Sequence, residues 1–296
     1  MKPLSTLAQS VRASTTMAID TQFKKMRAEG IDVIGFSVGE PDFPTPERIK
    51  QAGIRAIEAD QTKYTPTPGT LAVRQAVCQR LAEDWGLHYT TDEVVVTGGG
   101  KPVLYTALKA LVNPGDEVIL PAPYWVSYYE LIQMVGGTPV VVETTEENGF
   151  NLTPQQLRQA ITPKTKALIL NSPSNPTGMI YSRQHLEDLA QVCLEADLYV
   201  IADEMYSKLI FDGKEFVSFP TLSEAVKAHT ILVNGASKTY AMTGWRIGFA
   251  AASREITQVM NNFLSHSLSG TCSIAQAAAA EAFGGPQEEI EAMRQA

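Results

Sequence analysis

The chain has 296 residues, of which 44% are hydrophobic and 19% charged. This composition is typical of a globular protein with one large domain or two. The formal net charge of -8 and the pI near 5.1 argue against a nucleic-acid partner, because binding the phosphate backbone requires clustered Lys and Arg side chains.

Targeting signals are weak in this sequence. No apolar run reaches the roughly 18 residues of a membrane span, and the first twenty residues lack a signal-peptide core. We therefore expect a cytoplasmic protein that does not bind membranes. Residues 1–17 contain no acidic side chain and several Ser and Thr, so a transit peptide is the second interpretation. Cys78, Cys193 and Cys272 have neither a disulfide pattern nor a zinc spacing, and we expect buried thiols and no metal.

Short apolar runs bounded by turn residues recur along the chain and predict buried strands. The predicted strands are Ile31–Phe36, Glu93–Thr97, Glu117–Leu120, Pro139–Glu143, Ala167–Leu170, Leu198–Ala202, Thr230–Val233 and Ile247–Ala251. The intervening segments of helical period include Pro46–Glu58, Leu71–Glu83, Pro102–Leu111, Gln184–Glu195 and Ile256–Phe263. This alternation predicts an α/β fold with a mostly parallel sheet. Residues 272–296 predict a helix broken at Gly284-Gly285-Pro286.

The first polar motif, Gly98-Gly99-Gly100-Lys101, lies between a predicted strand and a helix whose first turn contains Pro102. Backbone amides at a glycine-rich helix start can bind a phosphate group. A dinucleotide site fits less well, because three consecutive glycines differ from the dinucleotide fingerprint and no matching acid follows about twenty residues later.

Aromatic and amide side chains follow the next two strands of interest. Tyr124 and Trp125 come after the strand at 117–120, where they either pack in a core or interface or stack on a ligand ring. The run from Asn171 to Gly178 contains two prolines, which favour a rigid loop at a strand's carboxyl end. Asn175 in this loop either donates to a ring oxygen or belongs to an ordinary turn.

Asp203 ends the predicted strand at 198–202. A carboxylate there is either a helix N-cap or a functional anion, because an unpaired buried charge is costly. Facing a pyridine nitrogen, Asp203 would keep that nitrogen protonated. Tyr206, three residues later, would reach the phenolic oxygen of the same ring.

The strongest motif follows the strand at 230–233 and runs from Asn234 to Gly248. Lys238 is flanked there by small and hydroxyl residues, and Arg246 lies eight residues further on. A lysine after a strand is often solvated, but this arrangement allows a phosphate to meet both the lysine segment and a guanidinium.

Taken together, these motifs resemble the class I/II aminotransferases of fold type I, and in particular the bacterial-type aspartate aminotransferase subgroup. The resemblance runs from Leu4 to about Ala280. Its seven ordered motifs are Gly39-Glu-Pro-Asp-Phe, Lys63-Tyr-Thr-Pro-Thr-Pro-Gly, Gly99-Gly-Lys, Pro123-Tyr-Trp-Val-Ser-Tyr, Asn171 to Gly178, Asp203-Glu-Met-Tyr and Ser237-Lys to Gly248.

The resemblance implies pyridoxal 5'-phosphate as cofactor, with Lys238 forming the internal aldimine and later acting as the general base. Asp203 would pair with the ring nitrogen, Asn175 and Tyr206 would hold the phenolic oxygen, and Trp125 would stack on the ring. The phosphate would lie among Gly99, Gly100, Lys101, Ser237 and Arg246. Tyr64 would reach the phosphate of the neighbouring subunit, so a homodimer with shared active sites is implied.

Substrate contacts are implied for Gly39, Lys101, Trp125, Asn175, Arg12 and Thr16. Lys101 would meet the distal carboxylate of an acidic substrate, with the Thr16 hydroxyl assisting. Arg12 is associated with prephenate use, or is simply a solvated charge. Aspartate, glutamate and 2-oxoglutarate are therefore the expected substrates, with prephenate or oxaloacetate as further ones.

The implied architecture is a seven-stranded, mostly parallel sheet between helices, with part of a small α+β domain. Residues 1–13 would form an arm, 14–42 the first part of the small domain, 43–280 the large cofactor domain, and 281–296 the start of a helix leading to an absent C-terminal domain. Relatives of this type are longer by roughly a hundred residues, which include an arginine that binds the substrate's α-carboxylate. We therefore expect a truncated chain that holds the cofactor but transaminates poorly.

Two other functions fit parts of the pattern. One keeps the cofactor but acts on aromatic or sulfur amino acids, by transamination or β-elimination. The other is a cofactor-binding remnant without turnover.

Overall fold

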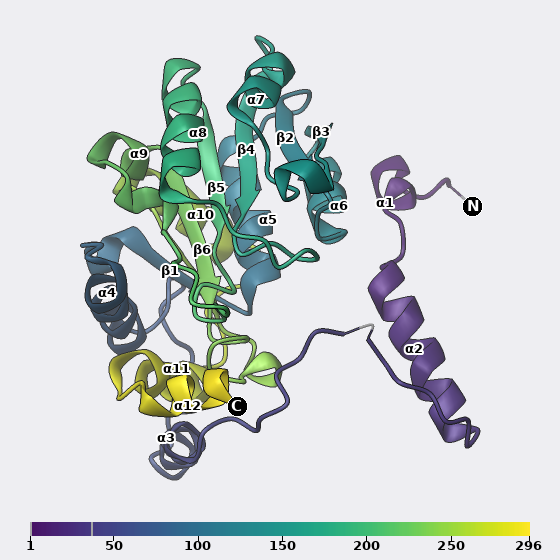
Figure 1. Cartoon of the computed structure of the whole chain (residues 1–296). Helices are drawn as coiled ribbons and strands as arrows, with labels where there is room; N and C mark the ends of the chain where they lie inside the picture. The colour runs from purple at the N-terminus through teal and green to yellow at the C-terminus, as the bar shows by residue number, and fades with distance from the viewer. Residues whose placement is uncertain (1, 37) are drawn as a thin grey trace.

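A seven-stranded sheet forms the centre of the molecule in the computed structural model, which describes residues 2–36 and 38–296 (Figure 1). Met1 and Ser37, in the expected segments 1–13 and 14–42, lie outside the described residues. The strand order is β1-β7-β6-β5-β4-β2-β3. The strands are β1 Val94–Thr97, β2 Glu117–Ala122, β3 Thr138–Glu143, β4 Thr165–Asn171, β5 Tyr199–Asp203, β6 Thr230–Gly235 and β7 Gly248–Ala251.

Parallel pairing dominates this sheet. Strand β7 runs antiparallel to its neighbours β1 and β6, and the other four pairings are parallel. This confirms the predicted mostly parallel sheet and seven of the eight predicted strands. Its connections are helical, as parallel neighbours require.

Twelve α-helices are found among the described residues. They are α1 Thr6–Ser10, α2 Thr15–Ala28, α3 Glu47–Glu58, α4 Leu71–Trp85, α5 Gly100–Leu111, α6 Ser127–Met134, α7 Pro154–Ala160, α8 Arg183–Glu195, α9 Glu224–Ala228, α10 Arg254–Ser265, α11 Ser273–Gly284 and α12 Glu288–Gln295. The break between α11 and α12 agrees with the predicted interruption at Gly284-Gly285-Pro286. None of the described helices has the length and apolarity needed to cross a membrane.

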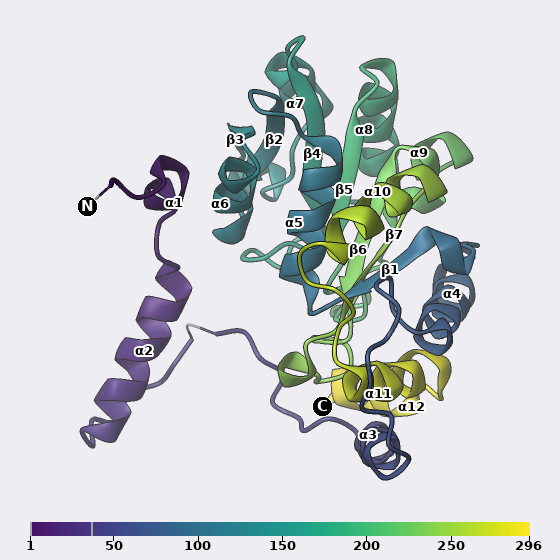
Figure 2. The ribbon, with the colours of Figure 1, turned by 180° about the vertical axis from the view of Figure 1, so that it is seen from behind.

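Helices cover both faces of the sheet. Helices α7, α8 and α9 lie on the face seen in Figure 1, and α5, α6 and α10 lie on the opposite face, seen in Figure 2. Side chains alternate between these layers along each strand: Ile201 packs with α5, α6 and α10, whereas Val200 and Ala202 pack with α7, α8 and α9. Burial of each such large aliphatic side chain contributes about 2 kcal/mol.

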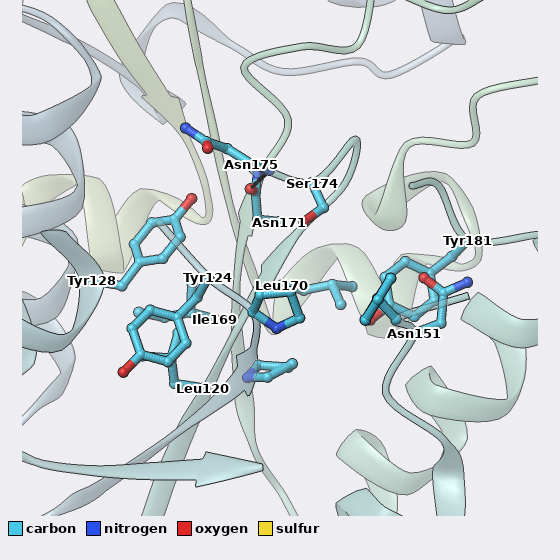
Figure 3. Close-up of a pocket in the computed structure, with 13 residues that line it drawn as sticks. Leu120, Tyr124, Tyr128, Asn151, Ile169, Leu170, Asn171, Ser174, Asn175 and Tyr181 are labelled. Carbon is cyan, nitrogen blue, oxygen red and sulfur yellow. Dashed lines mark hydrogen bonds between the residues drawn. The ribbon is translucent and has the colours of Figure 1, made fainter. Parts of the chain in front are cut away.

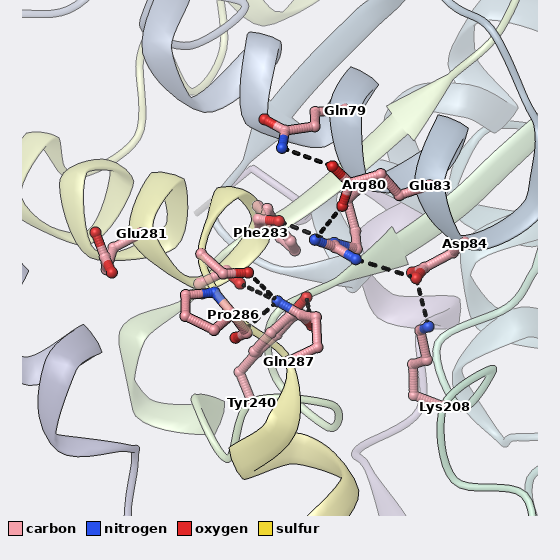
Figure 4. Close-up of polar contacts among 12 residues, drawn as sticks. Gln79, Arg80, Glu83, Asp84, Lys208, Tyr240, Glu281, Phe283, Pro286 and Gln287 are labelled. Carbon is pink, nitrogen blue, oxygen red and sulfur yellow. Dashed lines mark hydrogen bonds and ion pairs between the residues drawn. The ribbon is translucent and has the colours of Figure 1, made fainter.

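A third core joins α3, α4 and α11 to strands β1 and β7 at the foot of the sheet. A polar network supports it (Figure 4). Arg80 on α4 donates to the Phe283 carbonyl on α11 at 2.9 Å and pairs with Asp84 at 3.2 Å. Lys208, in the segment after β5, pairs with the same Asp84 at 2.6 Å. Helix α4 therefore holds both the C-terminal helices and the chain that leaves β5.

Two expectations from the sequence are wrong. Residues 31–36 form no strand, and Ile34 and Phe36 are 82% and 93% exposed. This segment follows α2 at a distance from the sheet (Figure 1), where no neighbouring strand satisfies its backbone. The second error is Cys272, which is exposed because it lies just before α11, while Cys193 is buried and Cys78 is partly buried.

Candidate active site

The strand-end motifs meet at one edge of the sheet. Asn171, the last residue of β4, pairs with Asp203, the last residue of β5, and Gly235 at the end of β6 pairs with Gly248. Thr97 at the end of β1 pairs with Gly248 from the other side. Strand register therefore brings four of the predicted motifs side by side, at the edge where open α/β sheets bind ligands.

Asp203 lies buried at the centre of this edge, with 5% of its surface exposed. The Tyr128 hydroxyl donates to its Oδ2 at 2.8 Å, and the Met205 backbone N–H donates to its Oδ1 at 3.2 Å. Burial raises the pKa of Asp203 to about 6, although both hydrogen bonds act in the opposite direction. Such a carboxylate is stabilised when a cationic group is placed against it.

An amide and a phenol lie beside Asp203. Asn171 Nδ2 donates to the Asp203 carbonyl at 2.9 Å, and Asn171 Oδ1 accepts from the Asn175 backbone N–H at 2.7 Å. Asn175 Nδ2 in turn donates to the Tyr206 hydroxyl at 3.3 Å. Burial raises the pKa of Tyr206, which therefore keeps its proton and can donate to an anionic oxygen.

Lys238 is partly buried three residues after β6. Its Nζ lies 5.9 Å from the centroid of the Tyr206 ring and donates to the Gly39 carbonyl. Burial lowers the pKa of Lys238, and the Arg246 guanidinium lowers it further, against an opposing effect of Glu40. A larger share of this amine is consequently unprotonated and nucleophilic than in an exposed lysine.

The glycine-rich start of α5 packs against Arg246. Gly99 adopts a φ of 107°, and a Cβ at this position would collide with the Arg246 guanidinium. A Cβ at Gly248 would come within 2.6 Å of the Gly100 backbone nitrogen. The first amides of a helix have no partner within that helix. With the Arg246 guanidinium beside them, these amides can bind an anion.

Lys101 and Trp125 close one side of the site. The Lys101 ammonium lies 4.9 Å from the centroid of a Trp125 ring, and Trp125 packs edge-on against Tyr128 at 5.4 Å between ring centroids. Burial lowers the pKa of Lys101, and Arg246 adds to this effect. Contacts thus run without interruption from Lys101 through Trp125 and Tyr128 to Asp203.

Two cavities border the cluster. A chamber of about 20 Å³ lies beside Asn171 and Asn175, with Tyr124 and Tyr128 on one side and Asn151 and Tyr181 on the other (Figure 3). A larger cavity of about 300 Å³ is lined by Gly39, Tyr206 and Lys238 together with residues of α12. The larger cavity has room for a small organic molecule against the lysine.

Three predicted residues lie apart from this cluster. Tyr64 is fully exposed. Arg12 is exposed, and its backbone N–H donates to Glu130 on α6 at 3.2 Å. Thr16 belongs to α2, which stands away from the sheet (Figure 1). Within one described chain, the structure does not bring these side chains to Lys238.

Sequence reasoning missed two members of the cluster. Tyr128 receives no role from the sequence, although it belongs to the motif that contains Trp125 and packs against that ring in the structure. Asn171 also receives no role from the sequence, yet at the end of β4 it bonds to both Asp203 and Asn175 and so links them.

The arrangement provides complementary groups for one type of ligand. It combines an anion site at a helix start, a buried carboxylate, paired phenol and amide donors, and an amine with a lowered pKa. A flat, phosphorylated, nitrogen-containing ring with an electrophilic carbon would use all four.

Comparisons with known proteins agree with this chemistry. The family model described as "Aminotransferase class I and II" matches residues 31–296. The chain is 48% identical over 293 residues to an aspartate aminotransferase of Bacillus sp. (strain YM-2), covering 99% of this chain and 75% of the relative. It is 47% identical over 294 residues to an aspartate/prephenate aminotransferase of Cereibacter sphaeroides, covering 99% and 74%.

The fold is also similar to solved structures. The aspartate aminotransferase from Thermus thermophilus with maleate matches with a TM-score of 0.95 and 41% identity, over 100% of this chain and 77% of that one. The enzyme from Rhizobium meliloti matches with a TM-score of 0.95 and 39% identity, over 100% and 74%. The chain thus spans about three quarters of the length of these relatives.

Proposed function

Since this chain belongs to the family of class I and II aminotransferases, we propose that it transfers the amino group of an acidic amino acid to a 2-oxo acid. Aspartate and glutamate are the proposed donors, and 2-oxoglutarate and oxaloacetate the proposed acceptors. Prephenate is a further acceptor, in keeping with the names of several relatives. The contacts that link Lys238 to Asp203 through Tyr206, Asn175 and Asn171 carry this proposal.

Pyridoxal 5'-phosphate, which enzymes of this family use, fits the donor set of the cluster. Its phosphate suits the start of α5 with Arg246 and Ser237, since backbone amides, a guanidinium and a hydroxyl all donate to phosphate oxygens. Its ring nitrogen suits Asp203, and its phenolic oxygen suits Tyr206 and Asn175. The half-buried Trp125 offers a flat surface for the ring.

When bound, the cofactor supplies a carbonyl for the substrate amine and an electron sink for the cleaved C–H bond. The remaining work falls to side chains of this chain. Asp203 would keep the ring nitrogen protonated, because a cation stabilises its buried charge. Lys238 would remove the proton from the substrate α-carbon, because its lowered pKa makes the neutral amine available as a base.

Lys101 is the proposed determinant of acidic substrates. Its ammonium lies over Trp125 at the side of the cluster. Gly39 and Asn175 are proposed to contact the substrate, with Thr16 and Arg12 as proposed contacts that require the N-terminal segment to lie nearer the site than it does here.

The proposed assembly is a homodimer with shared sites. Tyr64 is fully exposed and is therefore accessible to a second copy of the chain. Residues 43–280 are the proposed cofactor domain, and residues 14–42 and 281–296 belong to a proposed second domain. The dimer is tested by measuring the molecular mass of the cofactor-loaded protein by sedimentation. A monomer mass at micromolar concentration would exclude a dimer.

The direct test of function is an assay of the chain with pyridoxal 5'-phosphate, aspartate and 2-oxoglutarate. We expect equimolar oxaloacetate and glutamate, with the parallel-line kinetics of two half-reactions. Ammonia release without an acceptor would indicate a lyase instead. A visible absorbance band of the bound cofactor without any turnover would indicate a binding remnant.

Replacing Lys101 by Ala should lower kcat/KM for aspartate by about 10- to 100-fold, because a charge-assisted hydrogen bond contributes roughly 1.5–3 kcal/mol. An aromatic donor such as phenylalanine should be little affected. Lys109→Ala is the matched control, because Lys109 lies on the same helix over the Tyr105 ring, 6.0 Å from its centroid. Equal losses for both donors would show that Lys101 acts on the cofactor rather than on substrate choice.

A further inference from the structure

A second buried acid follows Asp203 directly. Glu204 is 2% exposed, and neighbouring residues of an extended chain point to opposite sides, so its side chain leaves the Asp203 site. The Ser218 hydroxyl donates to its Oε2 at 2.7 Å, and the Phe219 backbone N–H donates to its Oε1 at 2.8 Å. Both donors are themselves buried. Glu204 therefore joins the two ends of the segment 204–219.

This segment is irregular between β5 and the short helical turn at 219–221. Its middle, residues 211–215, is exposed. Ordering so many residues outside a helix or sheet costs conformational entropy. A few contacts at the base of the segment offset this cost. Besides those of Glu204, these contacts include Asn234 Nδ2 with Ser207 Oγ at 3.0 Å, Lys208 with Asp84 at 2.6 Å and Arg294 with the Ile210 carbonyl at 3.0 Å (Figure 4 shows the second).

Tyr206 lies at the start of the same segment. Its backbone carbonyl accepts from Leu209 N–H at 2.8 Å, and the Glu204 carbonyl accepts from Ser207 N–H at 3.0 Å. The turn therefore sets where the Tyr206 ring lies relative to Lys238 and where its hydroxyl meets Asn175. A shift in the turn would change both contacts.

We propose that Glu204 is a positioning residue of the active site. Its hydrogen bonds to Ser218 and Phe219 hold the turn at 203–207, and with it Tyr206, in place. This inference rests on the proposed function, because it assigns Tyr206 to the cofactor oxygen. Glu204 would act through the turn, because its side chain bonds to Ser218 and Phe219 and not to the residues around Lys238.

The two hydrogen bonds of Glu204 depend on geometry rather than on charge. Burial raises the pKa of Glu204 to about 8, so near pH 7 much of the side chain is neutral. Glutamine has the same shape: its carbonyl oxygen can accept from the Phe219 N–H, and its amide can donate to Ser218 Oγ after the hydroxyl rotates. Glu204→Gln should therefore preserve both hydrogen bonds, whereas Glu204→Ala removes them.

The test is a pH titration of the visible absorbance of the cofactor bound at Lys238, which reports the surroundings of its phenolic oxygen. We expect Glu204→Ala to shift the titration midpoint by about half a pH unit or more, a threefold change in proton affinity. Glu204→Gln should keep the wild-type midpoint. Thr230→Val is the matched control, since it removes a buried hydroxyl that donates to the Val226 carbonyl at 2.7 Å at the opposite end of β6.

Each other outcome overturns the proposal. If Glu204→Ala folds and keeps the wild-type midpoint, Glu204 does not position Tyr206. If the Ala and Gln variants shift the midpoint equally, the effect comes from the charge of Glu204. If Glu204→Ala does not fold, Ser218→Ala is the second variant, because it removes the hydrogen bond from the Ser218 hydroxyl to Glu204. It should also shift the midpoint. An unchanged midpoint overturns the proposal. A wild-type protein without a Lys238-dependent band would overturn the proposed function itself.

Discussion

Replacing Lys238 by Ala is expected to lower the rate of transamination by about 10²- to 10⁴-fold, the range of a general base, while the protein stays folded. Lys238 has a lowered pKa, and it lies between Gly39 and Tyr206 at the larger cavity. A methyl group can neither attack a carbonyl nor carry a proton. The measurement is single-turnover conversion of aspartate, followed by the change in cofactor absorbance.

Lys238→Arg separates the chemistry of the amine from its charge. Arginine stays protonated at every accessible pH and cannot serve as nucleophile or base, so we expect it to be as inactive as alanine. Lys166→Ala is the control, because Lys166 also lies over an aromatic ring, 5.4 Å from the centroid of Tyr199, but far from the cluster in the sheet. Retention of more than about a tenth of the activity in Lys238→Arg would mean that another group moves the proton.

Asp203→Asn is expected to lower kcat by about 10³-fold, equivalent to roughly 4 kcal/mol of transition-state stabilisation. A neutral amide cannot hold a proton on the ring nitrogen, so the electron sink weakens. In the variant the amide oxygen can still accept from the Met205 N–H, and the amide NH2 can donate to the Tyr128 hydroxyl after the hydroxyl rotates, so the local fold is kept. Activity within tenfold of wild type would show that Asp203 does not face the nitrogen.

The same variant should be more stable than wild type when the cofactor is absent. The pKa of Asp203 is raised in the folded state to about 6 from 3.8. The folded protein therefore binds this proton more tightly than the unfolded chain. The contribution of this proton to the free energy of unfolding is fully present below pH 3.8. It is lost as the pH rises through 6. The loss is about 3 kcal/mol for the buried carboxylate, and Asn avoids it.

Denaturant unfolding of the cofactor-free proteins at pH 4 and pH 7 measures this difference. We expect the free energy of unfolding of wild type to fall relative to that of Asp203→Asn between these two values. Cofactor addition at pH 7 should then stabilise wild type more than the variant, because only the carboxylate gains a cationic partner. Parallel pH dependence of the two proteins would show that Asp203 is not the group being titrated.

The sequence by itself determined the sheet and the strand ends of the site. Apolar runs such as Ala167–Leu170 and Leu198–Ala202 mark buried strands, because burial on both faces leaves a continuous local pattern. Asp203 and Lys238 follow such runs directly, so their place at one sheet edge was predictable from chain order. The misread segment at 31–36 has the same local pattern but no strand beside it.

The tertiary structure decided which side chains touch. Tyr128 and Asp203 are 75 residues apart, and Lys238 and Gly39 are 199 apart, so no local spacing encodes these contacts. The same holds for Glu204, whose partners lie across an irregular segment of the chain. Burial is also a property of the folded molecule: it sets the direction in which the pKa values of Asp203, Glu204 and Lys238 move, since desolvation depends on what surrounds a group in space.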